Sequence, residues 1–102
     1  MFNQGMLNKL KKMQKEMLKA QQDLEDSVFV GTAGGVISVE VKGNKQVVAV
    51  KIQPEAVDPE DVNLLEDMIL AAFNDAFKQI DNKTEEIMAP YTSSVPGMGG
   101  LF

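Results

Sequence analysis

The sequence of 102 residues contains no cysteine, no histidine, no tryptophan and no arginine. Without cysteine and histidine the chain has no thiolate nucleophile, no imidazole base, no disulfide and none of the usual nitrogen or sulfur ligands of a zinc site. Most enzyme classes are thereby excluded. A small hydrolase would be left with carboxylate, hydroxyl and lysine groups, and no constellation of these indicates an active site. We therefore expect no catalytic residues, no metal site, no cofactor and no small-molecule substrate.

Long apolar runs are missing as well. The longest uncharged stretch, residues 87–102, is interrupted by Pro90, Pro96 and several glycines, so we expect no segment of the chain to span a bilayer. The sequence also lacks the charged start and apolar run of a signal peptide. We expect a cytoplasmic protein without a membrane partner.

Charge of the two signs is unevenly distributed. The ten lysines and 15 acidic residues give a formal net charge of −5. Residues 1–22 hold five lysines and one acid, for +4, whereas residues 23–102 hold five lysines and 14 acids, for −9. The length and the hydrophobic content of 44% are typical of one globular domain, here residues 1–91. The domain thus combines a basic segment with an acidic body.

A helix is predicted over residues 4–26. Apolar residues recur there at alternating spacings of four and three, which is the pattern of an amphipathic helix. They are Met6, Leu10, Met13, Met17, Ala20 and Leu24. On the opposite side, four lysines fall within roughly 100° of arc, and a fifth lies at the flank. These are Lys11, Lys12, Lys15 and Lys19, with Lys9 at the flank.

Residues 28–53 change to a hydrophobic period of two, which indicates a three-stranded antiparallel meander. The first strand is expected at 28–30, and Gly31, Gly34 and Gly35 mark its turn or a bulge. The second and third strands alternate apolar and polar residues over 37–42 and 48–52. Between them, Gly43 and Asn44 have the chemistry of a hairpin turn. The fold class is therefore predicted as α+β.

A second helix is predicted over residues 59–89, with Asp58 as its N-cap, Pro59 at its first position and Pro90 after its end. Its apolar residues occupy more than one side, so packing on the sheet leaves an excess. We expect a homodimer interface there, with intramolecular cover by the first helix as the alternative. The interface candidates are Leu65, Met68, Ile69, Phe73 and Phe77. Residues 92–102, which contain glycine and proline and show no period, are expected to form a mobile tail.

Four segments carry a family resemblance. They are the pair Gly34-Gly35 with the residues 36–39 that follow it, the segments 50–55 and 96–102, and above all residues 65–78, LEDMILAAFNDAFK. With these segments the chain resembles the YbaB/EbfC family of small bacterial nucleoid-associated proteins. The resemblance implies a helix, three strands and a helix, dimerised so that helices project like tweezers. It also implies a protein that binds duplex DNA and influences nucleoid organisation or gene expression, without catalytic residues.

The lysines of the first helix are the candidate DNA-binding residues. Lys11 to Lys19 cover about 12 Å of helix, and each ammonium group can contact a phosphate as a point charge. A solvated face of an amphipathic helix is the plain alternative. Lys78 and Lys83 on the second helix are weaker candidates. Without arginine the commonest bidentate contact to guanine is missing, so we expect weak sequence preference. The competing function is a protein-interaction adaptor that uses the acidic surface and the methionine-rich seam.

Overall fold

A computed structural model describes residues 3–92 of the chain. Its elements are α1 (Gln4–Asp26), β1 (Val28–Ala33), β2 (Ile37–Lys42), β3 (Val47–Ile52), the short 3₁₀ helix η1 (Pro54–Ala56) and α2 (Val62–Thr92). The strands form one antiparallel sheet in the order β1-β2-β3. The predicted α+β fold, a helix, a three-stranded meander and a helix, is confirmed. The residues predicted as a mobile tail lie outside the described range, except Thr92, which ends α2.

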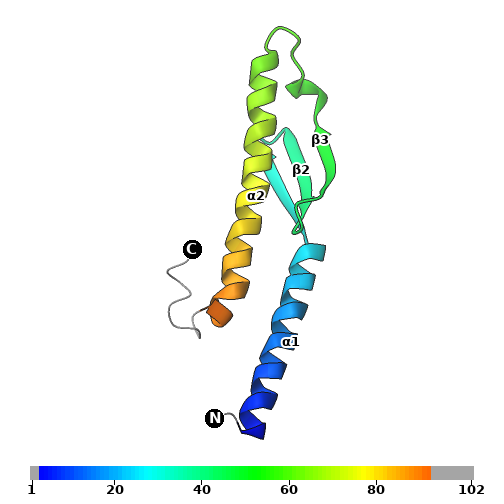
Figure 1. Ribbon diagram of the computed structural model, residues 1–102. Helices are drawn as coiled ribbons and strands as arrows, with labels where there is room; N and C mark the ends of the chain where they lie inside the picture. The colour runs from blue at the N-terminus through cyan, green and yellow to red at the C-terminus, as the bar shows by residue number, and fades with distance from the viewer. Residues whose placement is uncertain (1–2, 93–102) are drawn as a thin grey trace.

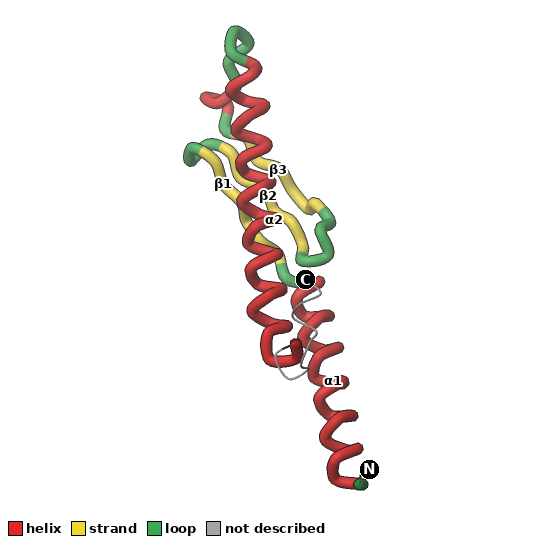
Figure 2. Tube along the Cα trace, turned by 60° about the vertical axis from the view of Figure 1, so that its left-hand side comes forward, coloured by secondary structure: helices red, strands yellow, loops and turns green. Residues whose placement is uncertain are grey.

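The molecule is elongated, with extents of 70 × 26 × 16 Å. Helix α2 runs along one face of the sheet, and α1 leaves the lower end of the sheet beside the C-terminal part of α2 (Figure 1). Seen from a second direction, α1 continues beyond the end of α2 (Figure 2). The N-terminal part of α1 is therefore a rod that projects from the rest of the fold.

Both ends of α1 are capped as the sequence pattern requires. The side chain of Asn3 accepts a hydrogen bond from Met6 N at 2.7 Å, and Ser27 donates from both its N and its Oγ to Asp23 O. The predicted bounds 4–26 agree with the structure. The apolar seam is covered only where α2 reaches it: Leu24 is buried, whereas Met6 and Leu10 remain 50% and 47% exposed.

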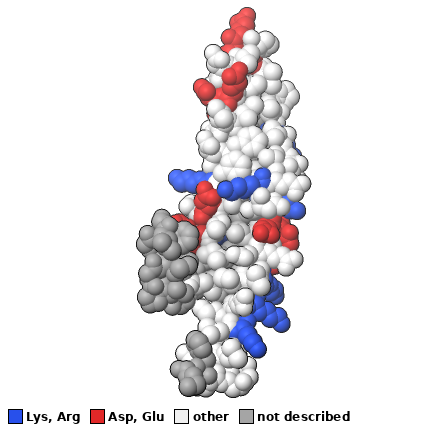
Figure 3. Space-filling view, in the orientation of Figure 1, with Lys and Arg blue, Asp and Glu red and all other residues white. Residues whose placement is uncertain are grey.

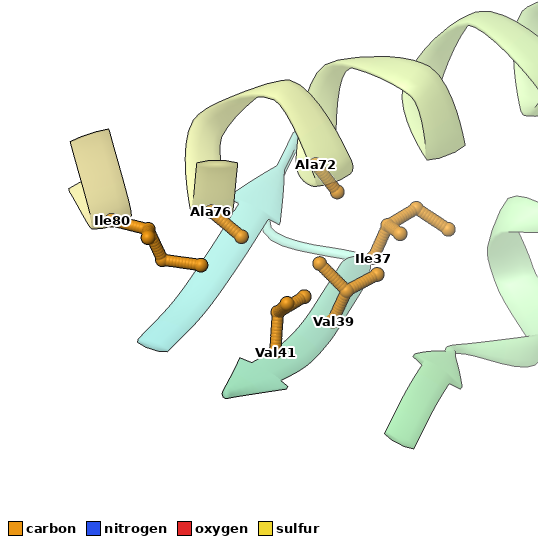
Figure 4. Packing of buried hydrophobic residues seen from close by; sticks show 6 residues of the cluster. All are labelled: Ile37, Val39, Val41, Ala72, Ala76 and Ile80. Carbon is orange, nitrogen blue, oxygen red and sulfur yellow. The ribbon is translucent and has the colours of Figure 1, made fainter. Parts of the chain in front are cut away.

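The core lies between β2 and α2. Six side chains at most 2% exposed meet there (Figure 4), namely Ile37, Val39, Val41, Ala72, Ala76 and Ile80. Gly31 of β1 allows α2 to come this close, because a Cβ atom at that position would overlap the carbonyl oxygen of Ala72 and lie 2.7 Å from Ala76 N. Gly31 therefore serves helix packing rather than the turn or bulge that we expected. The turn after β1 uses Gly34 and Gly35, both with positive φ.

The two edges of the sheet differ. At the free edge of β1, Gln79 Nε2 donates to Val30 O at 2.8 Å, and Asp75 Oδ2 accepts from Thr32 N at 3.0 Å. Side chains of α2 thus occupy the backbone groups that would otherwise pair with another strand. The structure shows no such side-chain bonds to β3 from residues 3–92. Helix α2 packs mainly on β1 and β2 and leaves the β3 side of the sheet uncovered.

The start of α2 was predicted three residues too early. Asp58 accepts from Glu60 N through its side chain and from Asp61 N through its carbonyl, so residues 58–61 form a turn. Asp61 then caps the helix by accepting from Leu64 N at 3.3 Å. The predicted end was also wrong, because α2 passes through Pro90 to Thr92. Proline there has no N–H, so the last turn of α2 lacks the backbone hydrogen bond that residue 90 would otherwise donate.

Between β2 and β3 the predicted hairpin is present, with a loop different from the expected Gly43-Asn44 turn. Lys42 N bonds to Gln46 O at 2.9 Å, and the left-handed residue is Lys45, with φ 72°. Asn44 Oδ1 accepts from Gln46 N, as an Asx turn does. A bulge at Glu40/Val41 shifts the register of β3, so that Val41 pairs with Val47.

Candidate nucleic-acid interface

The five lysines of α1 form what we call the lysine face: Lys9, Lys11, Lys12, Lys15 and Lys19. All five are exposed. Among residues 3–92 the ion pairs are Lys45–Asp81 at 4.0 Å and Lys83–Glu86 at 3.3 Å, so no carboxylate of the described chain forms an ion pair with the lysine face. Within this range the five ammonium groups are therefore open to solvent rather than paired with acids of their own chain.

Helical geometry fixes the shape of the lysine face. Lys11 to Lys19 extend over about 12 Å of a straight rod, at a rise of 1.5 Å per residue. The lysines stand on a convex surface rather than in a groove, and each can reach a phosphate oxygen from its own direction. Such an array can bind a polyanion through charge and can follow a backbone, but it provides no enclosed site for a small ligand.

Acidic residues gather at the other end of the molecule. Residues 55–67 contain six acids and no lysine, all six acids exposed. In the space-filling view, acidic side chains, in red, lie at the top of the molecule, and lysine side chains, in blue, lie over α1 at the lower end (Figure 3). The molecule is therefore electrically polar along its long axis, with its positive end at the projecting helix.

Groups that could contact base edges are sparse on α1. Asn8 Oδ1 accepts from Gln4 Nε2 at 3.3 Å, and Gln21 Nε2 is turned toward Met88 Sδ at 4.0 Å. Gln14 and Gln22 are exposed. Because Gln21 is turned toward α2, it cannot face DNA at the same time. Of these Asn and Gln side chains, Gln21 is therefore not available to contact bases.

The two lysine candidates on α2 are not part of the lysine face. Lys78 is exposed, and Lys83 is exposed but pairs with Glu86 one turn later. Such an exposed pair is worth at most about 1 kcal/mol, so it hinders phosphate binding by Lys83 only slightly. Both stand on α2, outside the lysine face.

The residues predicted for a dimer interface all lie half-buried against the core. Leu65, Met68, Ile69, Phe73 and Phe77 pack on the buried cluster of their own chain. The last two stack on each other, with ring centroids 6.2 Å apart. At 100° per residue, these two rings lie on the flank of α2 opposite Asp75 and Gln79, hence toward β3. Leu64 and Leu70, at 53% and 61% exposure, belong to the same apolar excess of α2 but were not among the five named interface candidates.

Other kinds of site find no support in the described part of the chain. Residues 3–92 contain no cluster of three or more acidic side chains placed to hold a metal ion. None of the helices in this range combines the length and the apolarity that crossing a membrane requires.

Sequence reasoning missed two features that matter for the site. The hydrogen bonds of Asp75 and Gln79 to β1 distinguish the closed edge of the sheet from the open one, and their only signal in the sequence is polarity on an otherwise apolar helix. The contact between Gly43 and the end of α1 was hidden by the hairpin signal of Gly43-Asn44. Both join residues that are at least 18 positions apart in sequence.

Comparison with known proteins adds independent information. The model of the YbaB/EbfC DNA-binding family matches residues 1–95. A nucleoid-associated protein of Oceanobacillus iheyensis is 44% identical over 100 residues, covering 92% of this chain and 96% of that protein. One from Ruminiclostridium cellulolyticum is 40% identical over 99 residues, covering 96% and 86%. The crystal structure of an uncharacterized protein of Helicobacter pylori shares the fold, with a TM-score of 0.69 at 20% identity, covering 89% and 98% of the two chains. The family match over residues 1–95 and these relatives show that this chain belongs to the YbaB/EbfC DNA-binding family.

Proposed function

We propose that this protein is a nucleoid-associated protein that binds duplex DNA, as a homodimer, through the lysine faces of two α1 helices, and that it is not an enzyme. DNA binding follows from the family to which the chain belongs. The single observation that supports α1 as the site is an exposed set of five lysines on a projecting rod, without carboxylate partners among residues 3–92.

Binding would be driven by the phosphates. Each lysine that neutralises a phosphate releases a condensed counterion, so affinity falls as salt rises. If two lysine faces neutralise roughly four to eight phosphates, the slope of log affinity against log salt concentration is about −4 to −7. The acidic end of the molecule would repel the duplex, and DNA is therefore held only in the orientation that α1 offers.

Little sequence preference is expected. Phosphate contacts fix position without reading bases, and the chain has no arginine to bind guanine in the major groove. Weak preference is suited to covering many sites on a chromosome. The proposal implies a location in the cytoplasm of a bacterium, on the nucleoid, where such binding would organise DNA and modulate gene expression.

The uncovered β3 side of the sheet supports the homodimer. Val50 and Ile52 pair with core residues of β2 on the α2 side, yet they are 46% and 37% exposed. Gln53 N donates to Val36 O, so alternation along the strand directs the backbone groups of Val50 and Ile52 toward the free edge. A second copy would pair there, β3 to β3, and bury the apolar surface.

The flank of α2 above β3 fits the same arrangement. A two-fold axis beside β3 would bring Phe73 and Phe77 of both copies over a continuous six-stranded sheet. The remaining interface candidates Leu65, Met68 and Ile69 face the sheet of their own chain, so we give them a supporting role. Because one sheet edge is closed by Asp75 and Gln79, pairing through β3 stops at two copies.

Replacing Val50 by lysine tests this interface. The expected result is a monomer in gel filtration with light scattering at micromolar concentration, because a charge would be buried at the two-fold axis. Val30→Lys is the matched control, since Val30 is also 46% exposed but lies on the closed strand β1. A monomeric wild-type protein would remove the dimer altogether, and a dimeric Val50→Lys variant would remove this interface.

The uncovered half of the α1 seam, where Met6 and Leu10 are exposed, keeps a second function open, a protein-interaction adaptor. Salt dependence separates the two functions. Fluorescence anisotropy with several unrelated duplexes, measured from low to high salt, should give similar affinities for all duplexes and a steep loss with salt. Affinity that is absent at low salt, or insensitive to salt, would contradict phosphate binding by the lysine face and favour an apolar contact of the seam.

A further inference from the structure

Helix α1 is attached to the body of the protein over a small area, which we call the joint. Leu24 is the one buried residue of α1, at 8% exposure. Gly43 N donates to Ser27 O at 2.9 Å, and Gln21 Nε2 contacts Met88 Sδ. Between these groups lies an open space of about 350 Å³. Few contacts therefore determine the direction in which α1 projects.

Gly43 lies where α1 meets the loop between β2 and β3. A Cβ atom at this position would overlap the carbonyl oxygen of Leu24 and lie 2.6 Å from its carbonyl carbon. Among the glycines described, only Gly34 and Gly35 have positive φ. A left-handed backbone therefore does not explain why position 43 is a glycine. What position 43 requires is the absence of a side chain, because the last turn of α1 rests directly on the loop backbone.

We propose that Gly43 is a positioning residue that sets the direction of α1 and, in the dimer, the separation of the two lysine faces on DNA. This inference depends on the proposed function. Any side chain at position 43 must push the end of α1 away, because neither overlapping group is the flexible end of a side chain. The displacement is small at the joint and grows along the helix.

The lever is long. Lys12 and Lys9 lie about 18 Å and about 22 Å along α1 from Leu24. A shift of about 1 Å on one side of a helix about 5 Å in radius therefore becomes roughly 4 to 5 Å at these lysines. Neighbouring phosphates on one strand of B-DNA are spaced by a similar distance. Two linked lysine faces that contact one duplex at the same time bind it more tightly than either face alone. If the distance between the two faces is wrong, only one face can bind at a time and this additional affinity is lost.

The chain allows a direct measurement, because it contains no cysteine and two introduced cysteines carry the only spin labels. We suggest Asn8→Cys on α1 and Asn82→Cys on α2, both exposed positions. Labelled protein is diluted with unlabelled protein, so that double electron–electron resonance reports the distance within one chain. Gly43→Ala is compared with Gly5→Ala, which adds the same methyl group to α1 where its nearest neighbour is Asn3 Oδ1 at 3.6 Å.

We expect Gly43→Ala to shift the mean label distance by roughly 5 Å or to broaden its distribution, and Gly5→Ala to leave it unchanged. In anisotropy titrations, Gly43→Ala should lose affinity about tenfold or more, and its salt slope should fall to roughly half, because one lysine face engages at a time. Partial unfolding would lower the active fraction without changing the slope, so the slope identifies a positioning role.

An unchanged distance distribution in folded Gly43→Ala would overturn the proposal, and so would a shifted distance with wild-type affinity and slope. If Gly43→Ala does not fold, Leu24→Ala loosens the joint without overlap, and the same two readouts then decide. A wild-type protein that does not bind duplex DNA would instead refute the proposed function, and the label distances would still report whether position 43 directs α1.

Discussion

Replacing four lysines of α1 by glutamine should abolish DNA binding without unfolding the protein. The substitutions are Lys11→Gln, Lys12→Gln, Lys15→Gln and Lys19→Gln. These side chains are exposed and form no ion pairs among residues 3–92, and glutamine has nearly the helix propensity of lysine. The free energy of unfolding should therefore change by less than about 0.5 kcal/mol per site. Circular dichroism and thermal melting check this part.

The size of the effect follows from the number of charges. In a dimer the variant removes eight of the ten ammonium groups on the two lysine faces. With about 0.9 of a unit of salt slope per neutralised phosphate, a slope of about −4 to −7 should fall to roughly −1, and affinity near 0.1 M salt should drop at least about 100-fold. Anisotropy with one labelled duplex at four or five salt concentrations measures both quantities.

A matched control separates the lysine face from net charge. Lys42→Gln, Lys45→Gln, Lys51→Gln and Lys78→Gln remove the same charge from the body, leaving both variants four units more negative than −5. We expect the control to lose affinity only a few-fold, because its lysines lie off α1. Equal losses in the two variants would refute the site, and retained binding by the α1 variant would move it elsewhere on the protein.

Three further predictions concern the body. Gly31→Ala should lower the free energy of unfolding by about 3 kcal/mol, measured in urea, because its methyl group overlaps the backbone of α2 at Ala72. Asp75→Ala combined with Gln79→Ala should open the β1 edge and yield species larger than a dimer in sedimentation velocity, whereas a fully dimeric variant would show that other features block this edge. Asp61→Ala should cost about 1 kcal/mol in the same urea assay, and no loss would mean that another group caps α2.

Local patterns were sufficient for most of the fold. The two hydrophobic periods located α1 and the three strands. In α1, β1 and β2 the period arises because one face is buried or shielded more than the other, whereas β3 alternates although its side chains are mostly exposed. The start of α2 was missed because Asp58 and Asp61 are both good N-caps, and which of them begins the helix depends on the turn between them. The first strand was predicted too short because Gly31 disfavours a strand unless a helix packs against it.

The site could be predicted only in part. Lysine spacing on a helix gives the direction of the lysine face, but whether acids of the same chain neutralise it depends on tertiary structure. The α2 residues that we assigned to a dimer interface are partly buried against the core of their own chain. The sequence could not show this, because an apolar side chain does not reveal which surface covers it. The contact of Gly43 with Leu24 has no local signature at all.

A protein with a net charge of −5 binds a polyanion best through lysines that lie beyond screening distance from most of its own acids. The Debye length is about 8 Å at physiological salt, and the acids of 55–67 lie at the opposite end of a molecule 70 Å long. Acids of α1 itself are closer. Glu16 lies about 4.5 Å along the axis from Lys19 and about 7.5 Å from Lys11, and Asp23 lies about 6 Å from Lys19 and about 18 Å from Lys11. The potential of the lysine face must therefore weaken toward the joint.

Lys11→Gln should reduce DNA affinity more than Lys19→Gln at 0.15 M salt in the same anisotropy assay, with the difference shrinking at 0.5 M. Equal effects at both salt concentrations would show that the acids near the joint do not influence the lysine face.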